Sequence, residues 1–292
     1  MRLILLFLGA VLFNSLAMAE PLLIRHLKEA HSDDRRTEYL VSVLSLALSK
    51  VLKESQYSLQ PAEILMKSTR AIDSLTSNSI DVVWGMTSMA RENKALAVRI
   101  PLLKGLLGHR IFLIREGDQP RFSQIKSIDE LKKLSAGQGS LWPDTTILKH
   151  NGFSVVSGSN YSGLFSMLHR KRFDYFPRGV HEPWYEVSAY KEQKLAVEQK
   201  LLIHYKSPVF FFVGRHNKNL HDLLERGLKI AIADGSFNKL LYNHQITKQI
   251  FEQANIDKRL IFDLHNPLLS PATQQIVNDT SLWYQVGDEL RQ

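Results

Sequence analysis

Apolar and polar residues follow two spacings along the first part of the chain, one typical of strands and one typical of helices. The segment 21–30 alternates loosely and predicts a strand, and apolar residues at three- and four-residue steps predict a helix within 31–52. Apolar runs predict strands at 57–65 and 80–86, and a short helix at 68–79 separates them. This strand–helix–strand–helix–strand order predicts a parallel sheet with both faces covered.

The same alternation returns later and predicts a second α/β unit over about 116–205. A strand at 109–116 leads out of the first unit, and a strongly apolar strand at 207–216 follows the second. The remaining expected elements are a helix within 137–153 that stops at Asn151-Gly152, a strand at 153–158, a helix at 159–171, a strand at 172–176, a helical region at 219–244 and an extended tail at 259–275.

The order of these elements predicts two lobes joined by two crossing strands. The crossings would be the strands at 109–116 and 207–216, and the C-terminal helices would return to the first lobe. We therefore expect an α/β fold with a discontinuous first lobe, 20–112 and 209–292, and a second lobe, 113–208. Two lobes that share such a hinge enclose a cleft and close around ligands.

The first 19 residues have the pattern of a secretory signal peptide. Arg2 precedes an apolar run, and Ala17-Met18-Ala19 forms a small-x-small cleavage site before Glu20. The run is short for a spanning helix, so we expect cleavage after Ala19 and an exported protein. The chain has no cysteine, which fits a bacterial periplasm better than a small disulfide-held module.

The charge balance is basic, with a formal net charge of +8. This excess is consistent with an anionic ligand or acidic partner, and equally with general surface charge. No dense basic run with interleaved aromatic residues is present, so we expect no nucleic-acid partner. The sequence also lacks a Gly-x-Ser-x-Gly elbow and a His-Glu-x-x-His motif, and we expect no cofactor, no metal and no catalytic residue.

Three stretches resemble the family 3 periplasmic solute-binding proteins, which include the substrate-binding proteins of amino-acid ABC transporters. Residues 68–93 run from a helix through an apolar strand to Gly-Met-Thr and then Arg91. Residues 127–140 are similar to the entry into lobe two, and 207–240 are similar to the second crossing strand with its following helix. The resemblance implies a two-lobed, type II Venus-flytrap fold that binds a small polar solute.

Candidate ligand contacts follow the first-lobe strand and open the second-lobe helix. By the resemblance, Arg91 corresponds to the arginine that grips a ligand carboxylate in the family, although it is shifted by about one position. The planar fork of a guanidinium suits that role. Thr87 and Ser88 offer hydroxyls, for a ligand or for local turn bonding. Ser140 leads into a helix whose free N–H groups favour anions, and Trp142 would be a cleft wall or a core residue.

The stretch Pro177-Arg178-Gly179 follows the strand at 172–176, which the sequence predicts to end at Pro177. Strands in such folds end at the binding crevice, so Arg178 would contact the ligand or pair with Glu182 or Glu186. Amino-acid binders of the family tend to place an Asp here, against the ligand amine. A cation in that place argues against a plain α-amino acid, unless Glu182 turns back to supply the carboxylate.

These observations together predict an exported, non-catalytic and monomeric protein that closes on a small anionic or zwitterionic solute. Its partner would be an ABC permease. Two alternatives stay open: a ligand-sensing module that docks to a membrane receptor, and a dehydratase-like enzyme of the same fold that depends on Glu182.

Overall fold

A computed structural model describes residues 20–28, 36–63, 68–77, 79–285 and 287. The expected signal peptide, 1–19, lies outside the described residues. Within those ranges, no helix combines the length and the apolar character that crossing a bilayer requires.

Strands and helices alternate along most of the chain. The strands are β1 (Leu22–His26), β2 (Tyr57–Pro61), β3 (Val82–Met86), β4 (Leu96–Val98), β5 (His109–Arg115), β6 (Ser135–Gly139), β7 (Ser154–Gly158), β8 (Phe176–Gly179), β9 (Leu195–Val197), β10 (Leu201–His204), β11 (Val209–Val213) and β12 (Leu260–Asp263). The α-helices are α1 (Arg36–Ser49), α2 (Ser68–Ser74), α3 (Met89–Lys94), α4 (Gln119–Ser123), α5 (Ile128–Lys132), α6 (Pro143–His150), α7 (Tyr161–His169), α8 (Pro183–Ala189), α9 (Lys218–Ala233), α10 (Ser236–Asn243), α11 (Gln245–Gln253) and α12 (Pro271–Ile276).

The first lobe is built on a sheet in the order β2-β1-β3-β11-β4. Strand β1 pairs in parallel with β2 and β3, as the sequence predicts, whereas β11 runs antiparallel between β3 and β4. Every residue of β11, including Phe210, Phe211 and Phe212, is buried. A strand that is buried on both faces has a continuous apolar sequence, as β11 does. Burial of each Phe side chain contributes about 1.5–3 kcal/mol to stability.

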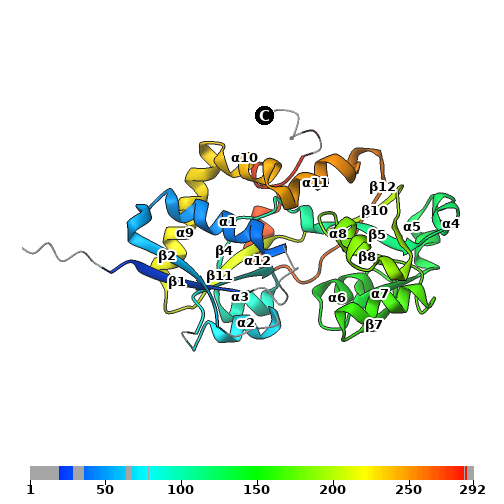
Figure 1. Cartoon of the computed structure of the whole chain (residues 1–292), viewed down its shortest axis with the longest axis horizontal. Helices are drawn as coiled ribbons and strands as arrows, with labels where there is room; N and C mark the ends of the chain where they lie inside the picture. The colour runs from blue at the N-terminus through cyan, green and yellow to red at the C-terminus, as the bar shows by residue number, and fades with distance from the viewer. Residues whose placement is uncertain (1–19, 29–35, 64–67, 78, 286, 288–292) are drawn as a thin grey trace, which may run out of the picture.

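The second lobe is built on a sheet in the order β12-β10-β5-β8, and β9 also pairs with β5. The parallel pair β6–β7 continues this layer, because the Gly137 backbone N–H donates to the Tyr175 carbonyl at 2.8 Å. Figure 1 shows the two lobes side by side, with α1 and α9 on the first and α6, α7 and α8 on the second. This is the two-lobed α/β fold that the sequence predicts.

The chain crosses between the sheets at close backbone contacts. The Tyr205 N–H donates to the Gly108 carbonyl at 3.1 Å, just before β5 and just after β10. The C-terminal segment provides a further connection between the lobes, because β12 pairs with β10 after α10 and α11 have packed against α1. The expected lobe limits, 20–112 with 209–292 and 113–208, stay a prediction.

Two expected elements differ from the structure. The strand predicted at 172–176, with its end at Pro177, is wrong, because β8 begins only at Phe176 and runs through Pro177 and Arg178 to Gly179. From Phe176 onward β8 pairs with β5, whereas the bridge to Ala136 of β6 is at Tyr175, and a strand with a ladder partner on one side admits proline. The tail expected to be extended over 259–275 contains α12, which begins with Ser270 as N-cap and Pro271 in the first turn.

The contact between α1 and α9 depends on Gly227. A Cβ added there would lie 1.9 Å from the Ala47 carbonyl oxygen. We expect Gly227→Ala to force the two helices apart and to lower the free energy of unfolding by about 1–3 kcal/mol in denaturant melts. Gly163→Ala in α7 is the control: its Cβ would meet only Asn160 at 3.5 Å, so stability should hold or rise. Equal losses in both variants would contradict this prediction.

Candidate ligand-binding cleft

A cleft of about 540 Å³ lies between α3 of the first lobe and the start of α6 in the second. Residues of the C-terminal segment between β12 and α12 also contribute to it. The lining residues are Ile72, Ser88, Met89, Ala90, Arg91, Lys94, Ser140, Leu141, Trp142, Pro143, Thr146, Pro267 and Leu268. Four of the sequence-predicted residues thus meet in one cleft: Ser88, Arg91, Ser140 and Trp142.

Arg91 enters the cleft from α3 and is partly buried. Ser88 caps this helix, because its Oγ accepts a hydrogen bond from the Arg91 backbone N–H at 3.3 Å. The Arg91 Nη1 donates to the Met86 carbonyl at 2.6 Å, and Gly85 leaves room for it. Among the described residues, no carboxylate pairs with this guanidinium. Its burial lowers the pKa of Arg91, since desolvation disfavours the charged form.

Ser140 and Trp142 occupy the opposite wall, at the turn between β6 and α6. The Ser140 N–H and Oγ both donate to the Gly158 carbonyl, at 3.0 and 3.3 Å. The indole of Trp142 lies against Gly139, where a Cβ would come within 2.5 Å of the ring. Gly139 is therefore required for this position of Trp142, which stacks on Phe176 with an interplanar angle of 13°.

Thr87 is fully buried and does not line the cleft. Its Oγ1 donates to Glu92 at 2.8 Å, and Glu92 also accepts hydrogen bonds from Ser270 and Thr273 at 2.7 and 2.6 Å. Arg99 forms an ion pair with the same carboxylate at 2.8 Å. This cluster attaches the start of α12, and with it the cleft residues Pro267 and Leu268, to the first lobe.

Arg178 lies inside the second lobe, in a row of alternating buried charges. Its guanidinium pairs with Glu182 at 2.8 Å and with Glu186 at 2.5 Å. Glu182 continues the row to Arg110 at 3.8 Å, and Arg110 pairs with Asp144 at 2.6 Å. Burial alone would lower the pKa of Arg178, but the two glutamates raise it well above its usual range.

This row of charges lies behind the cleft wall at Trp142 and Pro143, which directly precede Asp144 in the chain. The Arg178 Cζ lies 5.0 Å from the centre of the Trp142 ring, an arrangement that fits a cation–π contact. Neither Arg178 nor Glu182 is among the residues that line the cleft. A ligand contact by either residue stays a prediction, and it would require this network to open.

Several lining residues carry no signal that the sequence analysis detected. Lys94 could have been predicted once Arg91 was placed on a helix at the cleft, because residues three apart share a helix face. Met89 and Leu141 are 49% and 75% exposed, and nothing in their local sequence distinguishes them from other surface apolar residues. Pro267 and Leu268 reach the cleft through tertiary contacts, such as the 2.8 Å hydrogen bond from the Met89 N–H to the Leu268 carbonyl.

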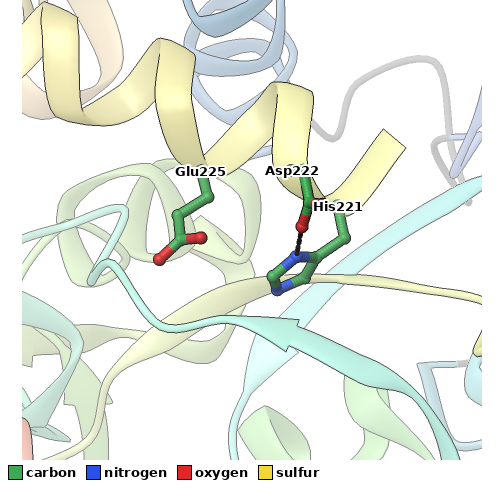
Figure 2. Close-up of side chains that lie close together, drawn as sticks. All are labelled: His221, Asp222 and Glu225. Carbon is green, nitrogen blue, oxygen red and sulfur yellow. Dashed lines mark hydrogen bonds and ion pairs between the residues drawn. The ribbon is translucent and has the colours of Figure 1, made fainter. Parts of the chain in front are cut away.

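One group among the described residues has the composition of a metal site. His221, Asp222 and Glu225 project from α9, and the His221 imidazole faces Asp222 at 2.9 Å (Figure 2). Both carboxylates already pair with lysines, Asp222 with Lys218 at 2.7 Å and Glu225 with Lys229 at 2.8 Å. The group lies outside the cleft lining, and its geometry carries no metal-dependent role.

Comparisons with known proteins place the fold among two-lobed periplasmic binding proteins. An arginine-binding periplasmic protein from Salmonella typhimurium shares 14% identity with the chain at a TM-score of 0.53, covering 76% of this chain and 97% of its own. A putative ABC-transporter binding component from Wolinella succinogenes, complexed with lysine, shares 12% at 0.55, covering 77% and 95%. The BvgS periplasmic VFT2 domain from Bordetella pertussis shares 16% at 0.57, covering 76% and 92%.

No family model matches the sequence, and no curated protein matches it either. The structural likeness at these identities establishes the fold and leaves the ligand to be argued from the cleft itself.

Glu92 should make the stability of the cleft depend on pH. Burial raises the pKa of Glu92, but the hydrogen bonds from its hydroxyl partners and from Arg99 together lower this pKa by more. The pKa of Glu92 in the folded protein therefore lies below the ordinary value of 4.5. A depressed carboxyl pKa contributes stability that is complete above the unfolded pKa and lost as pH falls through the folded pKa. We expect Glu92→Gln to cost about 1–3 kcal/mol near neutral pH, and less below pH 4.5, in denaturant melts.

Glu225→Gln, which removes an exposed ion pair, is the control for this measurement and should change stability little. A Glu92→Gln deficit that stays constant as the pH is lowered would show that the carboxylate charge does not matter there.

Arg178 should be essential for the stability of the second lobe. Arg178→Met leaves Glu182 and Glu186 buried without their cation, and breaking a buried pair in this way costs about 3–5 kcal/mol. Arg172→Met, at an exposed position nearby, should lie within about 0.5 kcal/mol of the parent. Thermal and denaturant unfolding would measure both, and a small effect of Arg178→Met would mean that the glutamates find other partners.

Proposed function

We propose that this chain is an exported, non-catalytic solute-binding protein that closes its two lobes on a small solute with an acidic group. The cleft between the lobes supports this function, because its walls come from both lobes and closure would bring them together. The structural relatives reported above include binding proteins of the same fold.

The observation that carries the proposal is the unpaired guanidinium of Arg91. Buried charges in proteins are normally paired, and Arg110, Arg178 and Arg259 of this chain all are. Arg91 is partly buried and lines the cleft, and its guanidinium has only the Met86 carbonyl as a hydrogen-bond partner among the described residues. A ligand carboxylate or phosphate would supply the missing counter-charge, and a guanidinium binds such groups in a bidentate fashion.

The charge network of the second lobe supports a non-catalytic role. Glu182, the acid on which an enzyme reading depends, pairs with Arg178 and accepts a hydrogen bond from the Gly179 N–H at 2.7 Å. Its side chain is only 9% exposed and lies outside the cleft lining. A carboxylate held in this way is poorly placed for proton transfer to a ligand.

The sequence pattern at 1–19 supports export to the periplasm, where a monomer would deliver its solute to an ABC permease. Docking to a membrane sensor is the alternative partner. Both roles require the same closed, liganded state, so ligand binding is tested first.

Removal of the Arg91 charge should abolish ligand binding while the fold survives. The mature chain would be screened by thermal shift against carboxylates, amino acids and phosphates, and the best ligand titrated by calorimetry. Truncating one partner of a buried charge pair costs about 2–5 kcal/mol of binding free energy, so Arg91→Gln should lose most of its affinity. Arg226→Gln, exposed on α9, is the matched control and should bind normally.

Two results would contradict the proposal. One is a panel in which no acidic solute raises the melting temperature or reduces the radius of gyration in solution scattering. The other is a ligand whose affinity is the same for Arg91→Gln and for the parent protein.

A further inference from the structure

The charges that line the cleft have one sign. Arg91 and Lys94 project from the same helix, three residues apart, and both are lining residues. Among the described residues, none of those that line the cleft is acidic. An ammonium group that entered here would therefore meet the unpaired guanidinium of Arg91 and no lining carboxylate.

Acidic side chains near the cleft walls are already neutralised by the protein. Glu92 is enclosed by Arg99 and three hydroxyl groups, so its oxygens are fully used. In the second lobe, Asp144 pairs with Arg110, and Glu186 pairs with Arg178. Recruiting any of these acids to a ligand amine would leave a buried guanidinium or several hydroxyls without partners, which is unfavourable.

Asp73 follows the lining residue Ile72 in the chain, and it pairs with Lys94 at 2.6 Å. Both side chains are more than half exposed, and exposed ion pairs of this kind contribute little. Lys94 is therefore free to turn toward a ligand anion at small cost, as a second cation beside Arg91.

The remaining lining is largely apolar. Met89 on one wall and Leu141 on the other are unusually exposed, at 49% and 75%, and Trp142, Pro267 and Leu268 continue the apolar surface. Closure of the lobes would remove this surface from water most effectively if the ligand itself presents an apolar body.

We propose that the ligand of this cleft is a small organic acid with an apolar body and no cationic group, rather than an α-amino acid. This inference rests on the proposed solute-binding function. Arg91 holds the acidic group, Lys94 adds a second favourable charge, and Met89, Leu141 and Trp142 enclose the apolar body. A zwitterion of the same shape is disfavoured because its ammonium lies among these cations.

The test compares ligands that differ only in the amine. Isocaproate and leucine share one carbon skeleton, as do hydrocinnamate and phenylalanine, and isoamylamine carries the amine without the acid. Calorimetry on the mature protein should show each carboxylate binding at least about tenfold more tightly than its amino acid, and no binding of isoamylamine.

Variants identify the source of this discrimination. Lys94→Gln should weaken carboxylate binding severalfold and reduce the preference for the acid over the amino acid, whereas Lys248→Gln, an exposed lysine on α11, should change neither. Leu141→Ser should weaken isocaproate and hydrocinnamate by about three- to tenfold without affecting the fold, since Leu141 is exposed.

The outcomes separate this inference from the proposed function. If leucine or phenylalanine binds as well as or better than its deaminated partner, the inference is overturned while solute binding stands. If neither acids nor amino acids bind, the proposed function fails together with the inference. If the acids bind more tightly but Lys94→Gln leaves the preference intact, the role of Lys94 is overturned.

Discussion

Charge burial is the constraint that most shapes this molecule. A guanidinium removed from water needs an opposite charge, and the second lobe meets this need with a row of residues, Asp144, Arg110, Glu182, Arg178 and Glu186. This row connects β5, β8, α6 and α8, so the start of α6 is held by charges as well as by packing. Arg91 has no carboxylate partner among the described residues, and this contrast is the reason for proposing that a bound ligand supplies one.

A second cluster of polar contacts explains how the C-terminal segment reaches the cleft. Glu92 accepts hydrogen bonds from three hydroxyl groups and forms an ion pair with Arg99. Two of those hydroxyl groups belong to Ser270 and Thr273 at the start of α12. The segment arrives there after β12 has paired with β10 of the other sheet. The segment that contains Pro267 and Leu268 is therefore attached to both lobes, and the lobe closure that we propose would shift it.

The sequence predicted the fold well because its signals are local. The stripe of α1, from Tyr39 to Leu48, is buried as the three- and four-residue spacing indicates, and the apolar run of β11 lies in the middle of its sheet. Helices and strands in this order leave few ways to cover a parallel sheet. The same locality explains why Ser88, Arg91, Ser140 and Trp142 were placed near one another, since each follows a strand that ends at the cleft.

Features that depend on distant partners could not be predicted in this way. The continuation of β8 through Pro177 depends on β5, and α12 depends in part on Glu92, far away in the sequence. The sequence left open whether Arg178 meets a ligand or a glutamate, because both fit a cation after a strand. Its burial beside Glu186, one turn beyond Glu182, depends on the tertiary position of α8, which packs against β5 and β9.

Trp142 lies between the buried charges of the second lobe and the cleft. One side of its indole meets Arg178 and Phe176 inside the second lobe, and the residue also lines the cleft. The cation behind it is compensated by Glu182 and Glu186, so Arg178 adds no net positive field to the cleft. Its contact with the indole supports the position of Trp142, and a well-supported aromatic wall would bind an apolar ligand with less loss of side-chain freedom. In the proposed complex, the charges that would select the ligand lie on the opposite wall, at Arg91 and Lys94.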